Sequence, residues 1–132
     1  MKFLIPFSIG LFFAITTILI HSLLTWHQQL ELMSSLMVLI GSVYFGFALK
    51  THNKTASWIE TMVAISFVIM GISGLWVSPW ILAAALLLHG FWDLIHHNPS
   101  KLLASIPKWY VPFCATYDWI MGGYLIYIFL KQ

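Results

Sequence analysis

The chain has 132 residues, of which 61% are hydrophobic and only 8% are charged, and its mean hydropathy is +0.91. A soluble domain carries about a quarter charged residues, so this composition is typical of an integral membrane protein. The six lysines are scattered, the net charge is only +2 and no basic patch exists, which excludes nucleic acid as a partner. The single cysteine, Cys114, excludes an intramolecular disulfide and a metal site built on a cysteine pair.

Five segments are long and apolar enough, or nearly so, to cross a bilayer as helices, because a span needs ~20 mostly apolar residues. The fold class that we predict is therefore all-α, a polytopic membrane helix bundle of five transmembrane helices in a single integral-membrane domain. The lipid bilayer is then its first partner. The predicted spans are residues 3–25, 33–50, 58–76, 79–97 and 112–130.

Local signals place the ends of some of these spans. The first apolar run is longer than the core of a secretory signal and no Ala-x-Ala cleavage motif follows it, so we expect a retained helix. Ser78-Pro79 predicts the start of the fourth helix, with serine as the cap and proline in the first turn. Only a few residues join the third and fourth spans, which predicts an antiparallel helical hairpin. The small residues at Ser42-x-x-x-Gly46 and Gly122-Gly123 predict close helix approach.

The lysines predict the orientation of the chain. If it crosses the membrane five times, one side receives five lysines and the other side receives only Lys131. By the positive-inside rule the amino terminus is then cytoplasmic. The five lysines on the predicted cytoplasmic side are Lys2, Lys50, Lys54, Lys101 and Lys108.

Three of the four acidic residues, Glu60, Asp93 and Asp118, lie inside or at the edge of a predicted span. An ionised carboxylate at the bilayer centre costs ~2.5–3.5 kcal/mol, whereas each leucine or isoleucine returns only ~0.3–0.6 kcal/mol. Such residues indicate a functional site by default. Glu60 has a second interpretation, because Ser57-x-x-Glu60 matches the capping box at the start of a helix.

A histidine run accompanies Asp93 in the fourth span, in the order His89-x-x-x-Asp93-x-x-His96-His97. At 100° per residue these four side chains occupy an arc of about 100° on one helix. The structural alternative is that Asp93 is held by His89 one turn away and only fixes helix register. His96 and His97 lie in the last turn, where a plain interfacial role is the alternative.

In the fifth span, Cys114 and Asp118 are four residues apart and share a helix face. If the fourth and fifth helices pack side by side, His89, Asp93 and Asp118 come to a similar depth in the cytoplasmic half of the membrane. For Cys114 alone, a small packing residue is the simpler interpretation. His21 and His27 lie near the opposite face, where we expect interfacial positions.

Imidazole and carboxylate groups are ordinary ligands of zinc and iron, which are the cofactors that this pattern would suit. A metal-free site is equally feasible, with His89, Asp93 and Asp118 in catalytic acid–base roles on a lipidic or small-molecule substrate. The residues that offer metal ligands are His89, Asp93, His96, His97 and Asp118.

A non-enzymatic function is the alternative, either a proton- or ion-coupled carrier or a subunit of a membrane complex. In that case Asp93 and Asp118 would carry the proton or ion. Five spans are few for a transporter, so this alternative calls for a homo-oligomer. The sequence does not decide between an enzyme and a carrier.

The stretch from His89 to His97, HGFWDLIHH, followed by Trp109-Tyr-Val-Pro-Phe-Cys114-x-x-x-Asp118, resembles a small uncharacterised family of bacterial integral-membrane proteins. The signature of that family is a His-x-x-Trp-Asp-x-x-His-His run followed by a cysteine and an aspartate in the last helix. The resemblance covers about residues 89–118 and implies a location in the bacterial inner (plasma) membrane, but it brings no activity. It singles out His89, Asp93, His96, His97, Cys114 and Asp118.

Overall fold

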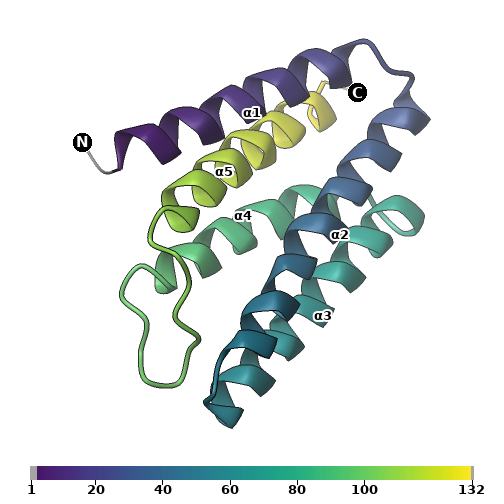
Figure 1. The fold of residues 1–132 in the computed structure, drawn as a ribbon. Coiled ribbons are helices and arrows are strands. Elements are labelled where there is room, and N and C mark those ends of the chain that lie inside the picture. The colour runs from purple at the N-terminus through teal and green to yellow at the C-terminus, as the bar shows by residue number, and fades with distance from the viewer. Residues whose placement is uncertain (1–2, 132) are drawn as a thin grey trace.

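A computed structural model describes residues 3–131 of the chain. These residues form five α-helices and no strand, so the all-α prediction is confirmed (Figure 1). Lys2, on which the predicted orientation partly rests, lies outside the described residues. The helices are α1 (Leu4–Ser22), α2 (Trp26–Lys50), α3 (Lys54–Trp76), α4 (Trp80–Ile95) and α5 (Tyr110–Phe129).

Helices α1, α2 and α3 are long and apolar enough to cross a membrane, and α4 is a shorter apolar helix. Large apolar side chains also cover the outside of the bundle, with Phe12 65% exposed, Leu39 64% exposed and Trp76 80% exposed. In water so much exposed apolar surface would be unfavourable, whereas lipid tails solvate it without cost. These features are those of a membrane protein.

Three helices begin earlier than hydropathy predicts, and the smallest difference is at α5, which starts at Tyr110 rather than residue 112. Helix α2 starts at Trp26 rather than residue 33, with Thr25 as its N-cap residue. The Gln28 side chain stabilises this start, since it accepts a hydrogen bond from the Thr25 amide. Helix α3 starts at Lys54 rather than residue 58, because the Asn53 side chain accepts hydrogen bonds from the next free backbone amides. Backbone hydrogen bonding extends a helix through polar residues, and hydropathy marks only its apolar part.

Helix α4 is shorter than predicted at both ends. It begins at Trp80 with Pro79 as N-cap, so the prediction that Ser78 caps it is wrong. The Ser78 carbonyl instead accepts a hydrogen bond from the Ile81 amide at 3.0 Å, which makes a tight first turn. At the other end the regular helix stops at Ile95, and a turn follows it. Differences of one or two residues at helix ends are ordinary.

The helices pack in the order α1, α5, α4, α3 and α2, so α4 and α5 lie in the middle of the bundle (Figure 1). Two glycines allow these two helices to approach closely. A side chain at Gly90 of α4 would meet the Trp119 ring, and one at Gly122 of α5 would meet Leu87. The prediction of close approach is therefore confirmed at Gly122.

The same prediction is wrong at two other glycines. No atom lies within 4 Å of the position that a side chain would take at Gly46 or at Gly123. Both glycines are exposed, so they face away from the helix interfaces. A small residue in a span therefore marks an interface only when the packing directs it toward a neighbouring helix.

Replacing Gly122 by valine is expected to destabilise the protein by about 1–3 kcal/mol, because the added methyl groups overlap Leu87 across the interface between α4 and α5. The matched control is Gly123→Val, which adds the same side chain at a position with open space. Thermal unfolding of the detergent-purified variants measures the difference. Equal melting temperatures for the two variants would contradict the close packing at Gly122.

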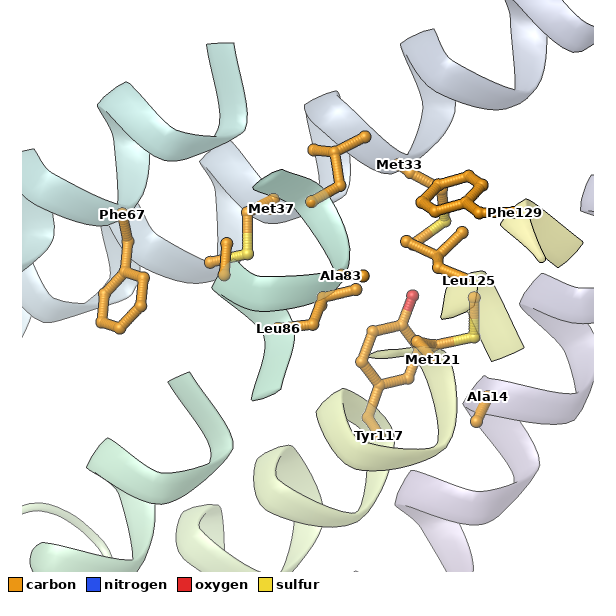
Figure 2. Packing of buried hydrophobic residues seen from close by; sticks show 12 residues of the cluster. Ala14, Met33, Met37, Phe67, Ala83, Leu86, Tyr117, Met121, Leu125 and Phe129 are labelled. Carbon is orange, nitrogen blue, oxygen red and sulfur yellow. The ribbon is translucent and has the colours of Figure 1, made fainter. Parts of the chain in front are cut away.

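Buried apolar side chains from α2, α4 and α5 fill one half of the bundle. Figure 2 shows part of this cluster, with Met33, Leu86, Met121 and Leu125 packed together. A second apolar cluster, which includes Tyr44, Ile106 and Tyr110, lies toward the loop between α4 and α5. His89 of α4 contacts both clusters, since its ring centroid lies 4.8 Å from that of Phe67 in the first and 5.3 Å from that of Tyr44 in the second.

Candidate metal centre

The centre is built around His89 of α4. Its Nδ1 atom lies 2.7 Å from Oδ2 of Asp118 on α5 and 3.5 Å from Oδ2 of Asp93, one turn further along α4. All three residues have an exposed fraction of 0%. The expected side-by-side packing of the fourth and fifth helices is therefore present, and it brings His89, Asp93 and Asp118 into contact.

Cys114 is the fourth member of this group, which we call the α4–α5 cluster. It lies one turn before Asp118, and its Sγ atom is 3.6 Å from Oδ2 of that residue. One ligand atom from each of His89, Asp93, Cys114 and Asp118 can be chosen so that all four lie within 4.8 Å of one another. Cys114 also packs in the second apolar cluster. It is therefore both a packing residue and a neighbour of Asp118.

Two tyrosines that the sequence did not single out complete the surroundings. The Tyr44 hydroxyl of α2 donates a hydrogen bond of 2.5 Å to Oδ1 of Asp93. The Cys114 thiol donates to the Tyr110 hydroxyl at 3.4 Å. In the sequence Tyr44 is only a tyrosine within a predicted span. A phenol is uncharged, so nothing distinguishes it there from an ordinary packing residue.

Several polar atoms of the cluster have no hydrogen-bond partner among the described residues. These atoms are Nε2 of His89, Oδ2 of Asp93 and Oδ1 of Asp118. Each buried polar atom without a partner costs about 1–3 kcal/mol, so native proteins contain few of them. Three of the five such atoms among the described residues lie in this one small site.

The cluster also holds more acidic groups than basic ones. Two carboxylic acids and a thiol share the site with one imidazole, and the nearest hydroxyls add no positive charge. A dry interior penalises an uncompensated negative charge strongly. No lysine lies among the buried polar and charged residues of the described chain, which are His21, Ser34, Glu60, His89, Asp93, His96 and Asp118.

A second buried pair shows what a balanced site looks like in this protein. Oε1 of Glu60 lies 2.8 Å from Nε2 of His96 and accepts a hydrogen bond from the Ala104 amide at 2.9 Å. Nδ1 of His96 donates to the Trp92 carbonyl at 3.0 Å. One acid and one imidazole carry no net charge together, whichever of them holds the shared proton.

This pair corrects two predictions. Glu60 does not cap a helix, since α3 begins six residues earlier and Glu60 lies fully buried in its interior. His96 is not a plain interfacial residue, since it is 3% exposed and bound to Glu60. The sequence could not show this pair, because its partners come from α3, the end of α4 and the following loop.

The remaining histidines lie outside the α4–α5 cluster. His96 is engaged by Glu60, and His97 is exposed with its ring 5.5 Å from that of Phe3. The five predicted metal ligands are therefore divided, and only His89, Asp93 and Asp118 come together. His21 is 1% exposed and its Nδ1 atom lies 3.0 Å from the Tyr124 hydroxyl, so it packs against α5.

The donor atoms of the cluster suit a borderline metal ion. Imidazole nitrogen, thiolate sulfur and carboxylate oxygen are the ligand set of zinc, and iron accepts the same types. Tyr44 supports one of these ligands, since it occupies Oδ1 of Asp93 and leaves Oδ2 free. The same groups can also exchange protons, because an imidazole between two carboxyl groups can take a proton from either.

No curated protein and no solved structure matches this chain. One family model does match it, and the match extends over residues 1–131, far beyond the stretch that carries the resemblance in the sequence. The chain therefore belongs to the family of unknown function DUF6010.

Proposed function

We propose that this membrane protein binds one zinc or iron ion in the α4–α5 cluster. The observation that carries the proposal is the gathering of four ligand groups from two helices, with ligand atoms within 4.8 Å of one another. A divalent cation would compensate the excess of acidic groups and give a partner to Oδ2 of Asp93, which has none among the described residues. The Glu60–His96 pair has no such excess of acidic groups, although Oε2 of Glu60 is also without a partner among the described residues.

The distances fit this proposal after small side-chain shifts. Two ligands of a tetrahedral zinc ion lie roughly 3.3–3.8 Å apart, given metal–ligand bonds of about 2.0–2.3 Å. The 3.5 Å between His89 and Asp93 falls in this range. The 2.7 Å between His89 and Asp118 is a hydrogen-bond distance, and this contact would lengthen when both groups turn to the ion.

The activity that we infer is metal-assisted or acid–base chemistry on a lipidic or small substrate, with His89, Asp93 and Asp118 in direct contact with the ion or the reacting atoms. A carrier is less well supported, because an ion path needs polar groups along its length. Between the cluster and the end of the bundle that holds Trp80 and Phe129, His21 and Ser34 are the buried polar side chains among the described residues, and the rest of the core is apolar, as at Leu86 and Met121.

We further propose that all five helices cross the membrane, with the amino terminus in the cytoplasm. Two contacts support this topology. The Asn53 side chain donates to the Lys101 carbonyl at 2.8 Å, and Phe3 lies beside His97, so the start of α1 and the two lysine-bearing loops are at one end of the bundle. By the positive-inside rule this end is cytoplasmic. The bacterial inner membrane is the location that we infer.

The test is the metal content of detergent-purified protein by elemental analysis. We expect close to one equivalent of zinc or iron in the wild type and loss of the ion in His89→Ala and Asp93→Ala. Asp118→Asn keeps the shape of the side chain, so it tests the ligand with the least damage to packing. His97→Ala is the matched control, because it removes an exposed imidazole from the same helix end and should leave the ion in place.

A folded wild type that holds no metal, even after loading with zinc or ferrous iron, would contradict the proposal. Helical circular dichroism and a single peak in size-exclusion chromatography establish that each sample is folded. Retention of the ion in both His89→Ala and Asp93→Ala would also contradict it, since the ion would then lie elsewhere. In either case Asp93 and Asp118 would be a proton-handling or register-fixing pair.

A further inference from the structure

A cavity of ≈ 270 Å³ lies between α1, α2 and α5. Its walls are almost entirely apolar and include Phe13 of α1, Leu36, Leu39 and Val43 of α2, and Phe113 of α5. Ligand pockets in proteins measure about 300–1,000 Å³, so the cavity is slightly smaller than that range. It has room for part of a ligand rather than for a whole large one.

The inner wall of this cavity includes Cys114. The same residue belongs to the α4–α5 cluster, where its Sγ atom lies 3.6 Å from Asp118. The cavity and the candidate metal centre therefore share Cys114. A molecule in the cavity would lie directly against one of the four ligand groups.

The polar atoms that the cavity does contain are already paired. The Tyr117 hydroxyl donates to Oγ1 of Thr17 at 3.3 Å, and Thr17 donates to the Phe13 carbonyl at 2.9 Å. No charged side chain lies among the described residues that line the cavity. A polar or charged ligand would lose its hydration there without compensation, whereas a hydrocarbon chain would not.

The position of the cavity identifies where a hydrocarbon chain would come from. Helices α1 and α2 are both long and apolar enough to cross a membrane. Phe13 lies nine residues after the start of α1, or roughly 14 Å along the helix, which is near the middle of a span. Leu39 is 64% exposed, so this wall of the cavity is also part of the lipid-facing surface.

We propose that the cavity binds an acyl chain of a membrane lipid and presents it to Cys114 and the centre behind it. The substrate class of the protein is then a lipid that enters sideways from the bilayer. The assignment of this lipid as a substrate rests on the proposed function, but the binding of the chain does not.

Photocrosslinking in liposomes tests the binding. The probe is a phosphatidylcholine with a diazirine in the middle of one acyl chain, mixed into unlabelled phosphatidylcholine vesicles that contain the full-length protein. Peptide mass spectrometry locates the crosslinks. Leu39→Trp fills the mouth of the cavity. Its matched control is Leu88→Trp, since Leu88 is 53% exposed and lines a separate apolar groove between α3 and α4.

We expect crosslinks to concentrate on the cavity residues of the wild type and to fall there at least tenfold in Leu39→Trp. Leu88→Trp should leave them unchanged. Crosslinks spread evenly over all exposed helices, or the same loss in both variants, would overturn the proposal. Metal analysis of the same samples distinguishes the lipid site from the metal centre. Cavity labelling without bound metal would refute only the metal centre. Bound metal without cavity labelling would refute only the lipid site.

Discussion

Replacing Glu60 by alanine is expected to lower the free energy of unfolding by about 3–5 kcal/mol, the range found when one partner of a buried ion pair is removed. Glu60 is fully buried and holds both His96 and the Ala104 amide through one carboxylate oxygen. Its loss leaves the Ala104 amide without an acceptor and Nε2 of His96 without a partner. It also releases the loop after α4, which this carboxylate ties to α3.

The chain contains a matched control for this substitution. Glu31 also pairs with a histidine, His27, at 3.0 Å, but the two side chains are 52% and 76% exposed. Glu31→Ala should change the stability by no more than about 0.5 kcal/mol, because exposed pairs contribute little. Equilibrium unfolding in mixed micelles, followed by tryptophan fluorescence, compares the variants. Equal losses in Glu60→Ala and Glu31→Ala would show that the buried pair does not stabilise the fold.

Replacing Tyr44 by phenylalanine is expected to weaken metal binding by about 10–100-fold, which is the usual effect of removing a group that orients a metal ligand. The Tyr44 hydroxyl bonds Oδ1 of Asp93 and so directs Oδ2 toward the rest of the cluster. Without this bond the carboxylate of Asp93 can rotate. Binding of the ion must then also fix this carboxylate, which lowers the affinity. The ring remains in place, so its apolar packing persists.

Competition with a colorimetric zinc chelator measures the affinity of the Tyr44→Phe variant. Tyr127→Phe is the control, because the Tyr127 hydroxyl faces Lys131 on the exposed end of α5 and has no contact with the cluster. Its affinity should equal that of the wild type. An unchanged affinity in Tyr44→Phe would place Asp93 outside the ligand set and leave His89, Cys114 and Asp118 as the only candidate ligands.

Much of the fold could be predicted from residue order alone. The apolar runs identified five helical segments, and the acidic residues within the fourth and fifth, Asp93 and Asp118, are buried. These signals are local, because the burial of apolar residues and the cost of a charge in lipid are properties of a single segment. Helix ends were predicted less well, since Asn53 and Thr25 determine them from outside the apolar runs.

The composition of the candidate site could be predicted only in part. Helical spacing placed His89 and Asp93 on one face and Cys114 and Asp118 on another, and these two faces do meet. The same spacing also placed His96 beside Asp93, although His96 turns to Glu60 of α3 instead. Spacing along one helix defines a face, but it does not say which neighbour that face meets.

The sequence by itself determined the apolar helices, the class of protein and the two helix faces that carry ionisable groups, because each depends on residues close together in the chain. Only the tertiary structure decided the partners of those groups. Tyr44 from α2 reaches Asp93 across 49 residues, and Glu60 from α3 reaches Ala104 across 44. Such pairings depend on helix order and on close contacts such as that at Gly122, and no local pattern encodes them.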